Sequence, residues 1–142
     1  MKKSMLVVVV VLLLGALVLT ACGGGAGEGS GTTRATVPAE FVMANPGAGD
    51  QAAIDAGKVL YTTNCVACHG ESGKGDGPAG ASLDPKPANL VTTAAETEPE
   101  YTHWVISEGG AAAGLGSSMV AYKGILTDDQ IWQVTSYIES LQ

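Results

Sequence analysis

Two cysteines and a histidine stand close together at residues 65–70, CVACHG, and this hexapeptide constrains the fold more than any other part of the chain. On a helical turn, Cys65 and Cys68 lie on one side, one turn apart, and His69 follows immediately. Two thiols and one imidazole can then react with or bind the same group. The rest of the chain must therefore fold around that bound group.

The spacing C-x-x-C-H is the attachment pattern for c-type haem. Each thiol can add to one vinyl group of the porphyrin, and the imidazole of His69 then comes under the iron as the proximal ligand. Three alternatives are weaker. A thioredoxin-like pair needs a βαβ context, a zinc site needs a second ligand pair that His103 and Cys22 do not supply, and a disulfide across C-x-x-C is strained. The motif predicts one covalent haem c.

Residues 1–21 have the layout of an export signal. Lys2 and Lys3 precede an uncharged apolar run at residues 5–19, and small residues follow it. As a helix the run would rise about 22 Å, which is less than the roughly 30 Å of a hydrocarbon core. This favours a cleaved signal peptide over an uncleaved membrane anchor.

The sequence Leu-Thr-Ala-Cys at residues 19–22 resembles a bacterial lipobox, in which the cysteine is acylated and becomes the new N-terminus. Acyl chains bury in the bilayer, and more than one chain gives lasting attachment. We therefore expect lipidated Cys22 to hold the protein at the outer face of the bacterial cytoplasmic membrane, on the periplasmic or extracellular side. A free or disulfide-bonded Cys22 is the alternative.

Acidic residues dominate the charge of the chain, with 14 Asp and Glu against 7 Lys and Arg and a net charge of −7. Loss of Lys2 and Lys3 with the signal makes the chain more acidic still. This balance argues against nucleic-acid binding, which needs a basic face, and favours a protein partner with a basic docking patch. Anionic lipid would repel the domain, so the acyl chains must supply membrane attachment.

The folded domain is predicted at residues 50–142. Residues 22–49 are predicted to consist of the lipidated Cys22 and a linker rich in Gly, Ala, Ser and Thr. Residues 38–43 of this linker are candidates to pack on the domain. Three helices are expected, at residues 50–66 and 98–108 and from Thr127 onward, where TDDQ forms a capping box. Gly109 and Gly110 would end the second helix. No strand pattern is present, so the domain is predicted to be all-α, with a small core that a large flat group would complete.

Residues 50–142 resemble a class I, mono-haem cytochrome c of the bacterial membrane-attached type. The resemblance is carried by Gly57 and Tyr61, by CVACHG, by GKGDGP at 73–78, by PKPANL at 85–90 and by SSMVAYKGILTDDQIWQVTSYIESL from residue 117. It implies a cytochrome c-like fold of about three main helices and long Gly-rich loops around one covalently bound haem. The first and last helices would cross near Gly57 and Tyr137 or Trp132.

The resemblance also implies the sixth ligand of the iron. Met119 lies in the loop ahead of the closing helix, where the family places its methionine, and His103 in the second helix is the weaker candidate. A thioether raises the haem potential and closes the iron to small ligands. The family usually follows this methionine with proline, which stiffens the loop; Val120 stands there instead and leaves the loop less determined.

The imidazole N–H of His69 needs an acceptor that fixes its tautomer. The resemblance implies a proline carbonyl, and Pro78 is the candidate, with a simple turn proline as the alternative. The haem propionates need hydrogen-bond donors. The candidates are Lys86, Asn89, Tyr101 and Trp104.

Ligation by His69 and Met119 implies outer-sphere transfer of one electron between redox-protein partners, with no catalytic residues. The protein would be a carrier or a cytochrome subunit of a respiratory or photosynthetic complex of the alternative complex III or oxidase type. The alternative is a haem enzyme or gas sensor with a vacant or labile sixth position, which only Val120 favours.

Overall fold

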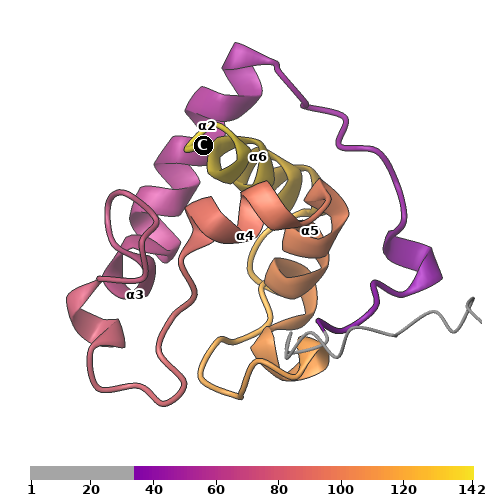
Figure 1. Cartoon of the computed structure of the whole chain (residues 1–142). Helices are drawn as coiled ribbons and strands as arrows, with labels where there is room; N and C mark the ends of the chain where they lie inside the picture. Colours follow the sequence, from indigo (N-terminus) through magenta and orange to yellow (C-terminus); the bar gives the residue numbers. More distant parts are fainter. Residues whose placement is uncertain (1–33) are drawn as a thin grey trace, which may run out of the picture. The chain divides into compact units, whose positions relative to one another are not determined.

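The computed structural model describes residues 34–142 (Figure 1), so the predicted signal at 1–21, Cys22 and the first part of the predicted linker lie outside the described residues. The elements are, in order, η2 (Ala39–Phe41), α2 (Gln51–Asn64), α3 (Val66–His69), η3 (Pro78–Gly80), α4 (Leu90–Glu96), α5 (Pro99–Glu108), η4 (Gly110–Ala113) and α6 (Asp128–Glu139). Within 34–142 there is no strand, and the all-α prediction is confirmed. The short helix α4 was not predicted.

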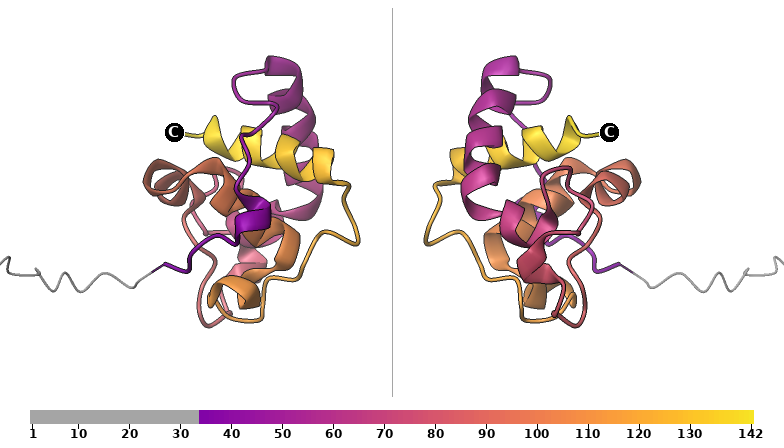
Figure 2. Two further views of the ribbon diagram at one scale, coloured as in Figure 1. Left: turned by 90° about the vertical axis from the view of Figure 1, so that its right-hand side faces the viewer. Right: turned by 90° about the vertical axis from the view of Figure 1, so that its left-hand side faces the viewer.

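Helices α2 and α6 cross at one end of the domain (Figure 2). Gly57 of α2 lies so close to α6 that a Cβ atom there would overlap the carbonyl of Gln133, and only glycine permits this approach. One turn later, the rings of Tyr61 and Tyr137 pack with their centroids 5.1 Å apart. The predicted crossing at Gly57 and Tyr137 is confirmed.

The core consists of two clusters of buried apolar side chains. The first joins α2, α4, α5 and α6 and contains Tyr61, Ala94, Ile106, Ile131, Val134, Tyr137 and Ile138. The second lies along α5 and η4 and contains Tyr101, Trp104, Val105 and Ala113. Met119 packs against both clusters, so the loop before α6 closes over the place where they meet.

The start of α6 is fixed by the predicted capping box. The hydroxyl of Thr127 accepts a hydrogen bond from the backbone N–H of Gln130 at 3.3 Å, and the side chain of Gln130 accepts one from the N–H of Thr127 at 2.9 Å. Two of the N–H groups that lack helical partners are thereby satisfied. The loop that carries Met119 therefore ends at a defined point.

The compact unit begins at Arg34, ahead of the predicted boundary at Asp50. We call residues 34–47 the N-terminal segment. Ala35, Val37 and Phe41 of this segment pack against the second cluster, and Figure 1 shows it running from η2 to the start of α2. The second half of the predicted linker thus lies on the domain.

None of the helices within 34–142 has both the length and the apolar character needed to cross a bilayer.

Candidate haem-binding site

The two cysteines lie where α2 ends and α3 begins. Cys65 separates the two helices, and Cys68 and His69 belong to α3. The backbone N–H groups of Cys68 and His69 both donate to the carbonyl of Cys65, at 3.1 and 2.9 Å, so one tight turn holds all three residues. Both thiols are free and half-buried. A single helical turn therefore presents two thiols and an imidazole.

Burial raises the pKa of the Cys65 thiol to about 12, and the neighbouring Cys68 adds to this effect. The Cys65 thiol is therefore neutral at physiological pH.

Tyr122 extends from the loop before α6 to the cysteine turn, because its hydroxyl donates to the carbonyl of Asn64 at 2.9 Å. Burial raises the pKa of Tyr122, and the two nearby thiols contribute. The cysteine turn and the loop that carries Met119 thus meet.

The ring of His69 is oriented by a backbone carbonyl. Its Nδ1 lies 3.2 Å from the carbonyl oxygen of Ala88. A carbonyl can only accept, so Nδ1 carries the proton and Nε2 presents its lone pair. Burial lowers the pKa of His69, and the bond to Ala88 acts in the opposite direction. The neutral imidazole that metal ligation requires is therefore favoured.

The predicted acceptor, Pro78, is corrected to Ala88. The carbonyl of Pro78 lies inside the turn η3 and faces the N–H of Ala81 at 3.5 Å. The following loop folds back over the turn, since the N–H of Leu90 donates to the carbonyl of Gly73 at 2.7 Å. This return brings the carbonyl of Ala88 to the imidazole.

Met119 is half-buried in a loop that is tied to the end of α5. A Cβ atom on Gly109, whose φ is +83°, would lie 2.9 Å from the carbonyl oxygen of Met119, so glycine permits the close approach. Three backbone hydrogen bonds hold the loop although Val120 replaces the expected proline. They run from Gly110 N–H to Met119 O (3.0 Å), from Tyr122 N–H to Ile106 O (3.0 Å) and from Lys123 N–H to Ser107 O (3.2 Å).

His103 is engaged with α6. Its Nε2 lies 3.0 Å from Oδ1 of Asp128, and its ring stacks on Trp132 at a centroid distance of 4.0 Å. The side chain is only 2% exposed, and burial lowers its pKa although Asp128 opposes this shift. Within the described residues Nδ1 of His103 is buried without a hydrogen-bond partner. The bond of Nε2 to Asp128 and the stacking on Trp132 nevertheless hold the ring against α6, and Met119 is the stronger candidate for the sixth ligand.

The predicted propionate donors differ in their surroundings. Tyr101 and Trp104 are each 5% exposed, and within the described residues the hydroxyl of Tyr101 is buried without a hydrogen-bond partner. A buried hydroxyl without a partner is costly, so it is available to a polar group of a cofactor. The side chain of Asn89 instead caps α4 by accepting from the N–H of Thr92 at 3.3 Å, and Lys86 is exposed.

These groups fit a c-type haem. A neutral imidazole nitrogen and a methionine thioether are a usual ligand pair for haem iron in electron-transfer proteins, and two free thiols share the turn with the imidazole. Residues 34–142 contain no group of three or more His, Cys, Asp or Glu side chains placed to share one metal ion. A model of the cytochrome c family matches residues 54–142.

The chain belongs to the cytochrome c family. It is a mono-haem, class I cytochrome c, and its cofactor is a covalently bound haem c with its iron. The predicted class I mono-haem family, the fold class and the haem c cofactor are thus confirmed, and the membrane-attached type stays a prediction.

Two curated relatives of this cytochrome c are cbb3-type cytochrome c oxidase subunits CcoP, from Azospirillum sp. (strain B510) and Azospirillum brasilense. They are 38% and 33% identical to it over 96 residues. Each match covers 63% of the present chain and 31% of the relative, so the chain spans about a third of the length of these relatives.

Two solved structures are similar to the cytochrome c domain. The reducing HAO-like protein complex of Kuenenia stuttgartiensis matches with a TM-score of 0.52 and 28% identity, over 64% of this chain and 44% of that chain. Cytochrome cL of Methylophaga aminisulfidivorans matches with a TM-score of 0.50 and 23% identity, and the match covers 80% of this chain and 71% of that chain. At 23% identity the likeness concerns the fold.

Sequence reasoning missed three parts of this cytochrome c site. Ala88 acts through its carbonyl, which every residue possesses, so its side chain gave no signal. Tyr122 belongs to the segment that carries the resemblance, and its position three residues after Met119 is a signal that its hydroxyl could tie the loop to another element. Gly109 was expected only to end α5, although two successive glycines there also indicate a close approach of another backbone.

Proposed function

We propose that this cytochrome c transfers single electrons with a haem bound to Cys65 and Cys68 through thioethers and ligated by His69 and Met119. The observation that carries the proposal is the hydrogen bond of His69, whose Nδ1 donates to Ala88 and whose Nε2 is thereby left with its lone pair on the turn shared with both cysteines. The attachment of the Met119 loop to α5 supports the second ligand.

The side chains around this site hold the ligands still during electron transfer. When bound, the haem supplies a reversible one-electron change at its iron. The carbonyl of Ala88 keeps the His69 ring in one tautomer and orientation. The hydrogen bond from Tyr122 to Asn64 joins the Met119 loop to the cysteine turn. Small rearrangement of the ligands favours fast exchange with a partner, because little has to be reorganised when the charge changes.

The optical spectrum of the purified holoprotein tests this proposal. We expect low-spin ferric haem with a weak near-infrared band from sulfur ligation, and a ferrous form that binds no carbon monoxide. Acidified acetone should leave the red pigment on the polypeptide, and the variant Cys65→Ser, Cys68→Ser should lose it to the solvent. High-spin iron that binds carbon monoxide readily would instead favour a haem enzyme or gas sensor, the function that Val120 alone favours.

We propose further that the protein acts at the outer face of the bacterial cytoplasmic membrane, held there by lipidated Cys22, and delivers electrons as a cytochrome subunit or close partner of an oxidase-type respiratory complex. The resemblance of residues 19–22 to a lipobox supports the anchor. The likeness to CcoP, an oxidase subunit, supports the complex. Copurification of an oxidase from a detergent extract would distinguish a stable subunit from a free carrier.

The variant Cys22→Ser tests the lipid anchor. Without an acylated cysteine the apolar attachment is lost, and the acidic domain has no charge attraction to anionic lipid. We expect the wild-type protein to sediment with membranes and to incorporate labelled palmitate. The variant should do neither, while Ser30→Ala behaves as wild type. Palmitate labelling of Cys22→Ser would contradict the assignment. If the variant is unlabelled but still sediments with membranes, and alkaline carbonate releases it, a protein partner holds it there.

A further inference from the structure

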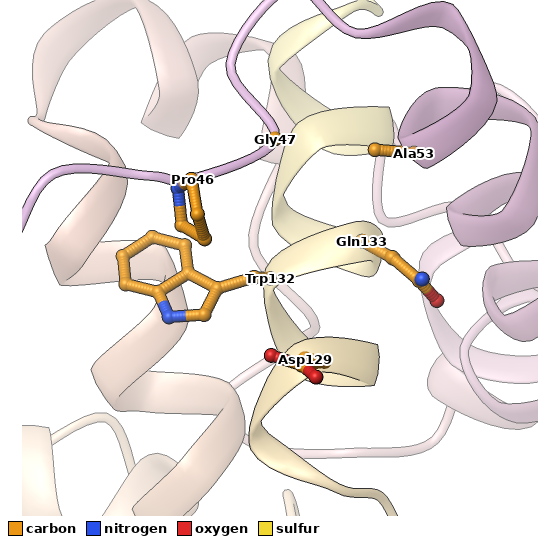
Figure 3. A pocket seen from close by; sticks show the side chains of 6 residues that line it. All are labelled: Pro46, Gly47, Ala53, Asp129, Trp132 and Gln133. Carbon is orange, nitrogen blue, oxygen red and sulfur yellow. The ribbon is translucent and has the colours of Figure 1, made fainter.

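The N-terminal segment contacts the pair of stacked rings that joins α5 to α6. The ring of Phe41 lies 5.9 Å from that of His103 on α5, which in turn stacks on Trp132 of α6 at 4.0 Å. Pro46 of the segment and Trp132 line the same groove (Figure 3). Trp132 itself is only 2% exposed. The segment therefore contacts both members of this ring pair, His103 through Phe41 and Trp132 through the groove that Pro46 lines.

Polar contacts fix the segment along its length. The side chain of Asn45 donates to the hydroxyl of Ser136 on α6 at 3.0 Å. The guanidinium of Arg34 lies over the ring of Tyr101 at 5.2 Å and pairs with Glu96 at 3.2 Å. Since contacts occur at its beginning, middle and end, the segment is held as one unit on α5 and α6.

The same helix α5 holds the Met119 loop. Ala35, Val37 and Phe41 pack against the cluster that contains Val105, and Met119 packs against that cluster too. The carbonyls of Ile106 and Ser107, which follow Val105, accept hydrogen bonds from the loop. A shift of α5 would therefore be transmitted to the loop through apolar packing and through backbone hydrogen bonds.

We propose that the N-terminal segment is a positioning element for the sixth-ligand loop. By holding α5 against α6 it fixes the anchor points of the loop, and it supplies the restraint that a proline at position 120 would give. The part of this inference that concerns iron ligation rests on the proposed role of Met119. The part that concerns the loop rests on the contacts alone.

The variant Phe41→Ala in the full-length holoprotein tests the inference, and Val42→Ala is the matched control because Val42 is 62% exposed. The first readout is amide hydrogen exchange at Gly110, Tyr122 and Lys123, whose N–H groups donate across the loop contact. We expect Phe41→Ala to accelerate exchange at these amides about tenfold, with no change at Tyr61 or Val134. A second variant, Asn45→Ala, should act in the same direction.

The second readout is the affinity of the ferric haem for added imidazole, which competes with the sixth ligand. We expect Phe41→Ala to bind imidazole about tenfold more tightly than wild type and Val42→Ala to bind it as wild type does. Met119→Ala gives the limit for a lost ligand. If Met119→Ala binds imidazole no more tightly than wild type, the proposal that Met119 is the sixth ligand fails. Amide hydrogen exchange alone then tests whether the segment positions the loop.

Three outcomes would overturn the inference. One is unchanged exchange at the three loop amides in Phe41→Ala. Another is equal acceleration at Tyr61 and Val134, which would indicate a general loss of stability. The third is selective exchange without tighter imidazole binding while Met119→Ala does bind more tightly, because the segment would then have no influence on the ligand.

Discussion

Replacement of Met119 by alanine is expected to lower the midpoint potential of the haem by on the order of 100 mV or more while the haem stays covalently attached. The thioether stabilises the ferrous state relative to the ferric state, and water or another weak ligand would replace it. The ferrous variant should also bind carbon monoxide, and the near-infrared sulfur band should disappear. Redox titration and optical spectroscopy of the purified variant measure all three effects.

Met43→Ala is the matched control for this experiment, because Met43 is 48% exposed. Its potential and spectrum should equal those of the wild type. An unchanged potential and spectrum in Met119→Ala would rule out this residue as the sixth ligand. His103→Ala would then be the next variant to examine, although the contacts of His103 with Asp128 and Trp132 argue against that assignment.

Replacement of Gly57 by alanine is expected to lower the free energy of unfolding by about 3 kcal/mol. Alanine is intrinsically the better helix former by about 1 kcal/mol, but its Cβ atom would overlap the backbone carbonyl of Gln133 on α6. A backbone group cannot turn aside as a flexible side chain can, so the two helices must separate. Guanidinium unfolding followed by far-ultraviolet circular dichroism measures the loss.

Gly124→Ala is the control, since a Cβ atom there meets nothing within 4 Å. Its unfolding free energy should stay within about 0.5 kcal/mol of the wild-type value. Wild-type stability in Gly57→Ala would show that α2 and α6 do not approach each other as closely as the structure describes.

The long helices and the family were predictable from the sequence because their signals are local. The capping box at Thr127 fixes the start of α6 within four residues of sequence, and CVACHG combines the thiols and the imidazole in one turn. Helix α4 was not predicted, since its seven residues, LVTTAAE, are too short to show helical periodicity and contain β-branched residues.

The acceptor of His69 and the packing of residues 34–49 depend on contacts between distant parts of the chain. Ala88 reaches the imidazole only because Leu90 bonds back to Gly73. Phe41 belongs to residues 38–43, which were expected to pack on the domain, and it does pack against the cluster on α5. The sequence alone does not show which helix such a residue contacts, because the partner lies about 60 residues further along the chain.

If Cys22 is lipidated, as we propose, the docked N-terminal segment would limit how far the haem domain can move from the bilayer. If the acyl chains sit on Cys22, about 12 residues separate them from Arg34, where the compact unit begins, and a fully stretched chain of that size spans only about 40 Å. A link that ran to Asp50 would span about 100 Å. With that anchor, electron donors and acceptors for this cytochrome would have to present their docking faces within a thin layer above the membrane.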